Sequence, residues 1–207
     1  EVLSQTMRQS VSELERFAAL ISEWPTTLPA LVRGTPKAIE QANFGLDFFC
    51  QKLQGSVCYL MDLHGQTIAS SNRHLPDSFV GESYAFRPYF QQALQGKAGN
   101  YFALGVTSKA MGDYASFPVR DQAGKILGVA VIKRTLNEIE TLIHEHYVGL
   151  VIDRRGIVVM SNRADMILKS LWPLTEKVRA ELIASRQFGG GPFTPILDQE
   201  PVDGGKY

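Results

Sequence analysis

The sequence predicts an α+β fold, with a sheet of antiparallel strands and helices gathered on one side of it. Three features support this prediction. A long helix-like stretch opens the chain, short apolar runs between residues 57 and 133 follow one another through tight turns, and a strand–turn–strand pattern returns in the last third of the chain. Successive strands joined by tight turns pair in antiparallel order.

Length and charge limit the classes of function. The chain has 207 residues, enough for one large domain or two small ones. Its 21 lysines and arginines balance 21 aspartates and glutamates, so we expect no nucleic-acid partner, and recognition of anions only at a local site. Because the chain starts inside an apparent helix and stops on Gly204-Gly205-Lys206-Tyr207, we expect it to be part of a longer protein.

The first helix is expected over residues 2–24, which contain no proline or glycine. Its apolar residues recur at steps of three and four: Leu3, Met7, Val11, Leu14, Ala18 and Ile21. That spacing predicts a helix with a narrow apolar seam, ended by Pro25. Such a seam packs either on its own domain or on a second copy of the chain, and we expect both, which includes a homodimer through this helix.

A second helix has a clear start at Thr35-Pro36, a hydroxyl at the N-cap followed by proline at the first helical position. Its apolar residues line one face as far as Leu53, and Gly55 is expected to end it. Two strands are expected next, over residues 57–61 and 67–70.

A repeat indicates two related modules in tandem. The first copy is Tyr59-Leu60-Met61-Asp62, Gly65 and Ser71-Asn72, and the second is Leu150-Val151-Ile152-Asp153, Gly156 and Ser161-Asn162. Between them we expect a short helix over 88–95, a hairpin of strands over 100–106 and 114–119, a strand over 126–133, and a linking helix over 136–146. After the second copy only a helix near 174–185 is expected, so the second module looks incomplete.

The residues from Tyr84 to Lys133 contain the inventory for holding a small anion with more than one carboxylate. Arg87 precedes Pro88, which predicts an extended backbone at a helix start, where backbone N–H groups attract anions and the guanidinium can grip a carboxylate. Lys133 ends an apolar strand, so its amine reaches the rim of a buried surface. Thr107 and Ser108 add adjacent hydroxyls at a strand end, and Tyr84 and Tyr114 add phenols.

Each of these residues also has an ordinary structural interpretation. Arg87 fits a surface arginine, Lys133 a side chain that reaches back to water, and Thr107 with Ser108 a capped turn. Tyrosines at strand ends are usually core residues with a hydrated hydroxyl. The combination, rather than any one residue, favours a binding site.

The combination also resembles a known family. The motifs are Ser71-Asn72, Phe79-Val80-Gly81, Tyr84-x-Phe86-Arg87-Pro88-Tyr89-Phe90, Gly96, Thr107-Ser108, Gly112-x-Tyr114, Pro118-Val119 and Gly128-Val129-Ala130-Val131-Ile132-Lys133. This pattern is similar to the double-Cache, or tandem PAS-like, sensor domain of C4-dicarboxylate-sensing histidine kinases. The resemblance is dense over residues 57–142 and looser on either side.

The resemblance implies an N-terminal stalk helix and connector over 1–34, a membrane-distal ligand-binding module over 35–142 and a partial membrane-proximal module over 143–207. Each module would have a central antiparallel sheet flanked by helices. It places the domain in the periplasm, in an inner-membrane protein anchored by flanking segments. By family motif, Arg87, Thr107, Ser108 and Lys133 would hold two carboxylates of a succinate, malate or fumarate type of ligand, and Tyr84 and Tyr114 would close the pocket.

One departure from the family pattern leaves the ligand open. Family members often have Pro-Gly-Tyr-Tyr where this chain has Met111-Gly112-Asp113-Tyr114. Asp113 could meet the amine of an amino acid or only solvent, and chemoreceptors and cyclic-dinucleotide enzymes carry similar sensors. A purely structural module is disfavoured, since burying two cations without an anion costs several kcal/mol.

Enzymatic activity within this stretch is not expected, although the longer protein would be a histidine kinase by resemblance. His144-Glu145-His146 is too closely spaced to place both rings on one helical face, and we expect no metal and no cofactor. No nucleophile elbow, P-loop or dinucleotide motif occurs. Cys50 and Cys58 would bridge in an oxidising compartment or remain buried free thiols, and the sequence leaves both readings open.

Overall fold

A computed structural model describes residues 2–53, 56–108, 111–135 and 149–199, which fall into two compact units, Glu1–Thr135 and Leu136–Tyr207. The first unit contains α1 (Val2–Ser22), α2 (Thr27–Arg33), α3 (Pro36–Lys52), β1 (Val57–Met61), β2 (Thr67–Ser70), α4 (Pro88–Leu94), β3 (Gly99–Leu104), β4 (Met111–Arg120) and β5 (Ile126–Thr135). The second contains β6 (Leu150–Ile152), β7 (Val158–Ser161), the 3-10 helix η1 (Ala164–Met166) and α6 (Glu176–Ser185). The linking helix expected over 136–146 lies outside the described residues.

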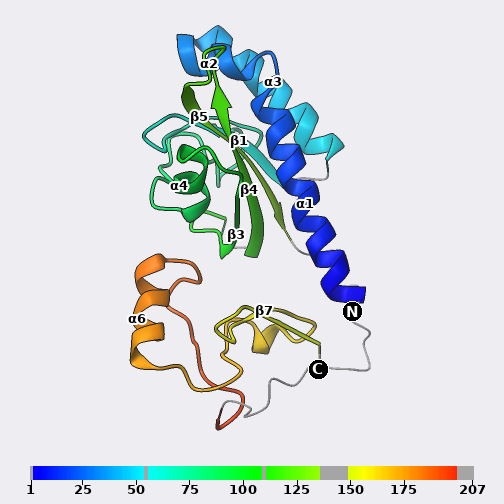
Figure 1. Cartoon of the computed structure of the whole chain (residues 1–207), viewed down its shortest axis with the longest axis vertical. Coiled ribbons are helices and arrows are strands. Elements are labelled where there is room, and N and C mark those ends of the chain that lie inside the picture. The colour runs from blue at the N-terminus through cyan, green and yellow to red at the C-terminus, as the bar shows by residue number, and fades with distance from the viewer. Residues whose placement is uncertain (1, 54–55, 109–110, 136–148, 200–207) are drawn as a thin grey trace. The chain divides into compact units, whose positions relative to one another are not determined.

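The first unit is built on a five-stranded sheet with the order β2-β1-β5-β4-β3 (Figure 1). Every neighbouring pair is antiparallel, which confirms the α+β prediction. Strands β2 and β3 form the two edges of the sheet. Strand β5 pairs with both β1 and β4 and therefore lies in the centre. Strand β5 is buried on both faces, which explains why the side chains on both of its faces are apolar.

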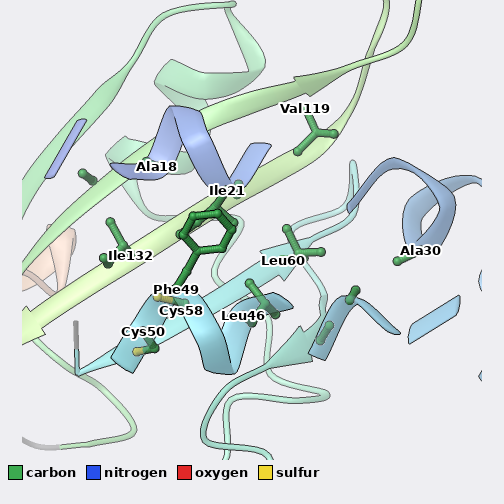
Figure 2. Close-up of a cluster of buried hydrophobic side chains, with 14 of the residues drawn as sticks. Ala18, Ile21, Ala30, Leu46, Phe49, Cys50, Cys58, Leu60, Val119 and Ile132 are labelled. Atoms are coloured by element: carbon green, nitrogen blue, oxygen red, sulfur yellow. The ribbon is translucent and has the colours of Figure 1, made fainter. Parts of the chain in front are cut away.

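Helices cover both faces of this sheet, not one face as the sequence predicted. Helices α1, α2 and α3 cover the first face, where the helix-side core includes Leu14, Ala18, Leu46, Leu60 and Ile132 (Figure 2). The short helix α4 packs on the opposite face with a second buried cluster, the cavity-side core, which includes Tyr59, Phe79, Tyr89, Tyr114 and Val131. Because β1 and β5 bury the side chains of both faces, each face needs a cover.

The N-terminal seam packs on its own sheet. Leu14, Ala18 and Ile21 are fully buried against it, whereas the side chains of Leu3, Met7 and Val11 lie outside the described residues. Dimerisation through this helix therefore stays a prediction. In the part of the chain that the structure describes, no helix combines the length and apolarity needed to cross a membrane.

Local signals placed most helix ends correctly. The Thr35 hydroxyl accepts a hydrogen bond from the backbone N–H of Ala38 at 3.3 Å, as expected of an N-cap. Helix α2, a seven-residue helix whose first turn contains Pro29, was not predicted from the sequence. Proline is tolerated in a first turn, so it did not mark a break here. Gly34 ends α2 in the left-handed conformation, with φ of 59°.

The hairpin of β3 and β4 differs from the prediction at both strands. β3 already ends at Leu104, which pairs with Met111, and β4 begins there rather than at Tyr114. Thr107 and Ser108 therefore lie in the connection and not at a strand end, while Gly112 and Asp113 are strand residues.

The aspartate-led turn of the predicted repeat is present in both units. Asp62 Oδ1 accepts from the N–H groups of residues 64 and 66, and Asp153 Oδ1 accepts from those of residues 155 and 157. The same turn also occurs at Asp121, between β4 and β5. The turn is therefore a recurring hairpin device, and the second copy of the repeat forms the β6–β7 hairpin. A relation between the two modules stays a prediction.

The second unit has its own small core. Strands β6 and β7 form a hairpin, and the Thr175 hydroxyl caps α6 by accepting from the Val178 N–H. Phe188 and Phe193 are fully buried, and Trp172 lies directly over Gly156. In the first unit, Cys50 and Cys58 are both buried and are not joined by a disulfide.

Candidate ligand-binding site

The cavity-side core contains a small cavity of about 10 Å³, room for about one water molecule. Its lining combines five aromatic rings, four of them tyrosines with a phenol hydroxyl, with one guanidinium and one aliphatic hydroxyl: Tyr59, Phe79, Tyr84, Arg87, Tyr89, Gly105, Val106, Thr107 and Tyr114. Four of the six predicted site residues are in this lining, namely Tyr84, Arg87, Thr107 and Tyr114. Ser108 and Lys133 lie next to the cavity rather than in its wall.

Arg87 is positioned by the proline that follows it. Its backbone is extended (φ −75°, ψ 133°) and it caps α4, as the Arg87-Pro88 pair predicted. The side chain is only 2% exposed. It donates from Nη2 to the backbone carbonyl of Leu104 at 2.9 Å, and its guanidinium carbon lies 5.0 Å from the centre of the Phe86 ring. An almost fully buried guanidinium thus reaches the cavity from the start of α4.

Lys133 approaches from the central strand β5 and is 1% exposed. Its ammonium donates a short hydrogen bond to the Ser108 hydroxyl. It lies 5.9 Å from the centre of the Phe79 ring and 5.7 Å from that of Tyr114, two residues that line the cavity. Burial lowers the pKa of Lys133 to about 8, although the negative charge of Asp77 opposes this shift, and the positive charge of Arg87 adds to it. The two cations therefore share one electrostatic environment.

Hydroxyl groups bridge the cavity wall. The Tyr84 hydroxyl and Thr107 Oγ1 are 2.8 Å apart, which ties the loop before α4 to the β3–β4 connection. Tyr114 stacks on Tyr89, with ring centres 5.4 Å apart and planes 3° from parallel. Burial raises the pKa of Tyr84 and of Tyr114, so both phenols remain neutral donors.

Two tyrosines of the cavity lining were not predicted from the sequence as site residues. Tyr59, on β1, and Tyr89, on α4, place their hydroxyls 2.7 Å apart, and Phe79 packs edge-on to the Tyr59 ring. The sequence predicts Tyr59 as part of an apolar strand and of the repeat, and not as a site residue. Its place in the cavity lining depends on the pairing of Tyr59 with Val131. This register joins distant segments, and local patterns do not reveal it.

Asp113 lies on the other face of the sheet. It neighbours Tyr114 on β4, and successive strand residues point to opposite faces. Tyr114 faces the cavity, whereas Asp113 lies on the face of α1, where Glu15 of α1 raises its pKa and Arg134, its partner on β5, lowers it. Burial raises the pKa of Asp113 to about 6. The acidic residue proposed to meet an amine is thus separated from the cavity by the sheet.

A central antiparallel sheet with a long N-terminal helix on one face, and a small cavity with buried cations under a short helix on the other, defines a PAS-like sensor domain. The sensor domain of the V. cholerae histidine kinase DctB superposes with a TM-score of 0.87 at 31% identity, covering 93% of this chain and 75% of that one. The chain belongs to the DctB family of sensor domains.

Curated relatives agree with this assignment. The chain is 33% identical over 190 residues to the C4-dicarboxylate transport sensor protein DctB of Pseudomonas aeruginosa, covering 91% of this chain and 30% of the relative. It is 31% identical over 196 residues to the protein of the same name from Rhizobium meliloti, covering 94% of this chain and 31% of that relative. The chain thus spans about a third of the length of these relatives. No family model matches the chain.

Proposed function

We propose that the first unit binds a small dicarboxylate of the succinate, malate or fumarate type. The observation that carries this proposal is the presence of two almost fully buried cations, Arg87 and Lys133, at one cavity. Burying one cation is costly, and burying a second beside it adds repulsion. A ligand with two carboxylates offsets both costs, because each carboxylate pairs with one cation and accepts from a hydroxyl.

The four hydroxyl-bearing side chains fit the same ligand. Thr107 and Ser108 come from the β3–β4 connection, Tyr84 from the loop before α4, and Tyr114 from β4. In this structure Thr107 pairs with Tyr84, and Ser108 pairs with Lys133. We propose that the carboxylates take over these hydrogen bonds. A cavity with room for one water is too small for succinate, so binding requires the connection to move relative to β5.

We further propose that this movement is the signal. The ligand would touch the start of α4, the β3–β4 connection and the end of β5 together, drawing them toward one another. By similarity to the DctB relatives, the domain would face the periplasm in an inner-membrane histidine kinase, and the shift would pass through the second module toward the membrane.

An amino acid is the alternative ligand, bound by a sensor of another output class. Its amine needs an acidic or carbonyl partner in the cavity, and Asp113 lies on the opposite face of the sheet. A thermal-shift screen of the 207-residue chain against dicarboxylates, monocarboxylates and amino acids separates these proposals. We expect stabilisation by C4-dicarboxylates. Stabilisation by amino acids alone would overturn the proposal.

A further inference from the structure

Gly112 lies where the side chain of Lys133 crosses β4. Gly112 pairs with Thr135 and Tyr114 pairs with Lys133, so all four residues face the cavity side, and Gly112 and Lys133 are diagonal neighbours. A Cβ atom at position 112 would lie 2.7 Å from Lys133 Cε and 3.2 Å from Lys133 Cγ. The lysine stem therefore occupies the space that any side chain at position 112 would take.

Other closely packed glycines of the sheet meet different neighbours. A Cβ at Gly99 would lie 2.6 Å from the backbone oxygen of Tyr89, and one at Gly128 would lie 2.5 Å from that of Met61. Backbone atoms cannot yield, so those two glycines are needed for the fold. At Gly112 the nearest backbone atom, the oxygen of Arg134, is 3.4 Å away, which is ordinary contact. A methyl group at position 112 would displace the flexible end of Lys133 and leave the strand in place.

We propose that Gly112 is a positioning residue for anion binding: its missing side chain lets the Lys133 stem lie across β4 and bring the ammonium to Ser108 beside the cavity. This inference rests on the proposed function for its ligand, the second carboxylate of a dicarboxylate. It also explains a choice that β propensity does not favour, because glycine weakens a strand interior and here marks a close approach.

A methyl group at position 112 should weaken only the binding of the carboxylate that contacts Lys133. Displacing Cε by the length needed to clear a methyl group moves the ammonium away from Ser108 and from the rings of Phe79 and Tyr114. Arg87 approaches from the start of α4 and keeps its position. Gly112→Ala should therefore weaken binding of succinate at least tenfold and leave the weak binding of butyrate, which needs one cation, within about twofold.

A double-mutant cycle tests this by calorimetry on the 207-residue chain with Gly112→Ala, Lys133→Ala and the double variant. Lys133→Ala removes both atoms that a methyl group at position 112 would meet. If Gly112 acts through Lys133, the double variant binds succinate as Lys133→Ala alone does. Additive losses, or an equal loss for butyrate, would overturn the inference. Gly190→Ala is the matched control, because no atom lies within 4 Å of its added Cβ.

A measurement without ligand keeps the two proposals separable. The NMR signal of the lysine side-chain Cε, assigned by its loss in Lys133→Ala, reports the titration of Lys133. We expect Gly112→Ala to shift the Lys133 titration midpoint by at least half a pH unit and Gly190→Ala to leave it unchanged. An unchanged midpoint in Gly112→Ala overturns the positioning role whatever succinate does. A shifted midpoint in a chain that does not bind succinate would support the positioning role and reject the dicarboxylate.

Discussion

Lys133 and Tyr114 face each other across β5 and β4, with the lysine ammonium 5.7 Å from the centre of the tyrosine ring. The pairing holds a cation among aromatic rings, with a neutral hydroxyl as its hydrogen-bond partner. Burial lowers the pKa of this lysine to about 8, so its charge depends on pH near the physiological range. The site is therefore sensitive to pH in a predictable direction.

The affinity for succinate should decrease above pH 8. A bound dianion favours the protonated amine of Lys133. At a pH where the free site has lost this proton, binding of succinate is therefore coupled to the uptake of one proton. We expect a constant affinity from pH 6 to 7 and a loss approaching tenfold per pH unit well above the pKa of about 8. Calorimetry across pH 6 to 9.5 measures this. The Lys133→Met variant should bind weakly and show no such step, and a step that survives in it would assign the titration to another group.

Replacing Arg87 should abolish binding while the domain stays folded. Removing one partner of a buried charged contact costs on the order of 2–5 kcal/mol, enough to remove micromolar affinity. Arg87→Ala is to be compared with Arg120→Ala, an exposed arginine whose Nη1 donates to the Gly124 carbonyl. Calorimetry with succinate should show near-normal binding for Arg120→Ala only. Near-normal binding by Arg87→Ala would place that residue outside the site.

Asp113 should make the fold less stable as the pH rises. Burial raises its pKa from 3.8 to about 6, so between these values the folded protein binds more protons than the unfolded chain. Stability from this group is present below pH 3.8 and is lost as the pH rises to 6, by on the order of 3 kcal/mol. Asp113→Asn should unfold at a higher temperature than the wild type at pH 8 and at a similar temperature at pH 4. Calorimetric scans at both pH values check this, and an equal difference at both would exclude the titration of Asp113 as the cause.

The β3–β4 connection should report ligand binding. Its residues Gly105–Thr107 line the cavity, and Ser108 holds Lys133. A ligand that bridges this segment to β5 should slow amide hydrogen exchange there at saturation, while the turn between β4 and β5, at the opposite end of both strands, serves as the reference. To move the domain from a mostly inactive to a mostly active population, the ligand needs about 5.5 kcal/mol of differential affinity between the two states. A micromolar ligand has about 8 kcal/mol of binding free energy in total, so this is sufficient. Unchanged exchange of this segment would rule out the proposed relay.

The sequence revealed what depends on local rules. Pro88 fixes the backbone of Arg87, and Thr35-Pro36 fixes the start of α3, so both were predicted correctly. The sequence left open whether Asp113 meets an amine or only solvent, because its neighbour Tyr114 was assigned to the cavity. Alternation along a strand separates the two residues. Once the extent of β4 is known, that alternation is unambiguous.

Features that depend on long-range register were not predictable. The hydroxyls of Tyr59 and Tyr89 come together in the cavity lining only because β1 pairs with β5 and α4 packs on the same face of the sheet. The approach of Gly112 to Lys133 arises in the same way, from the pairing of β4 with β5. Neither contact leaves a periodic pattern in one segment of the chain.

Binding of succinate and butyrate to the 207-residue chain, compared by calorimetry at pH 7, tests the central claim most directly. The two ligands share a four-carbon chain and differ in the second carboxylate, so the comparison measures what the second buried cation contributes. Succinate has about eight non-hydrogen atoms, and at roughly 1 kcal/mol per atom its dissociation constant should be near micromolar. We expect butyrate to bind at least tenfold more weakly, because it leaves one of Arg87 and Lys133 without a carboxylate. Equal affinity for the two ligands would contradict the dicarboxylate site.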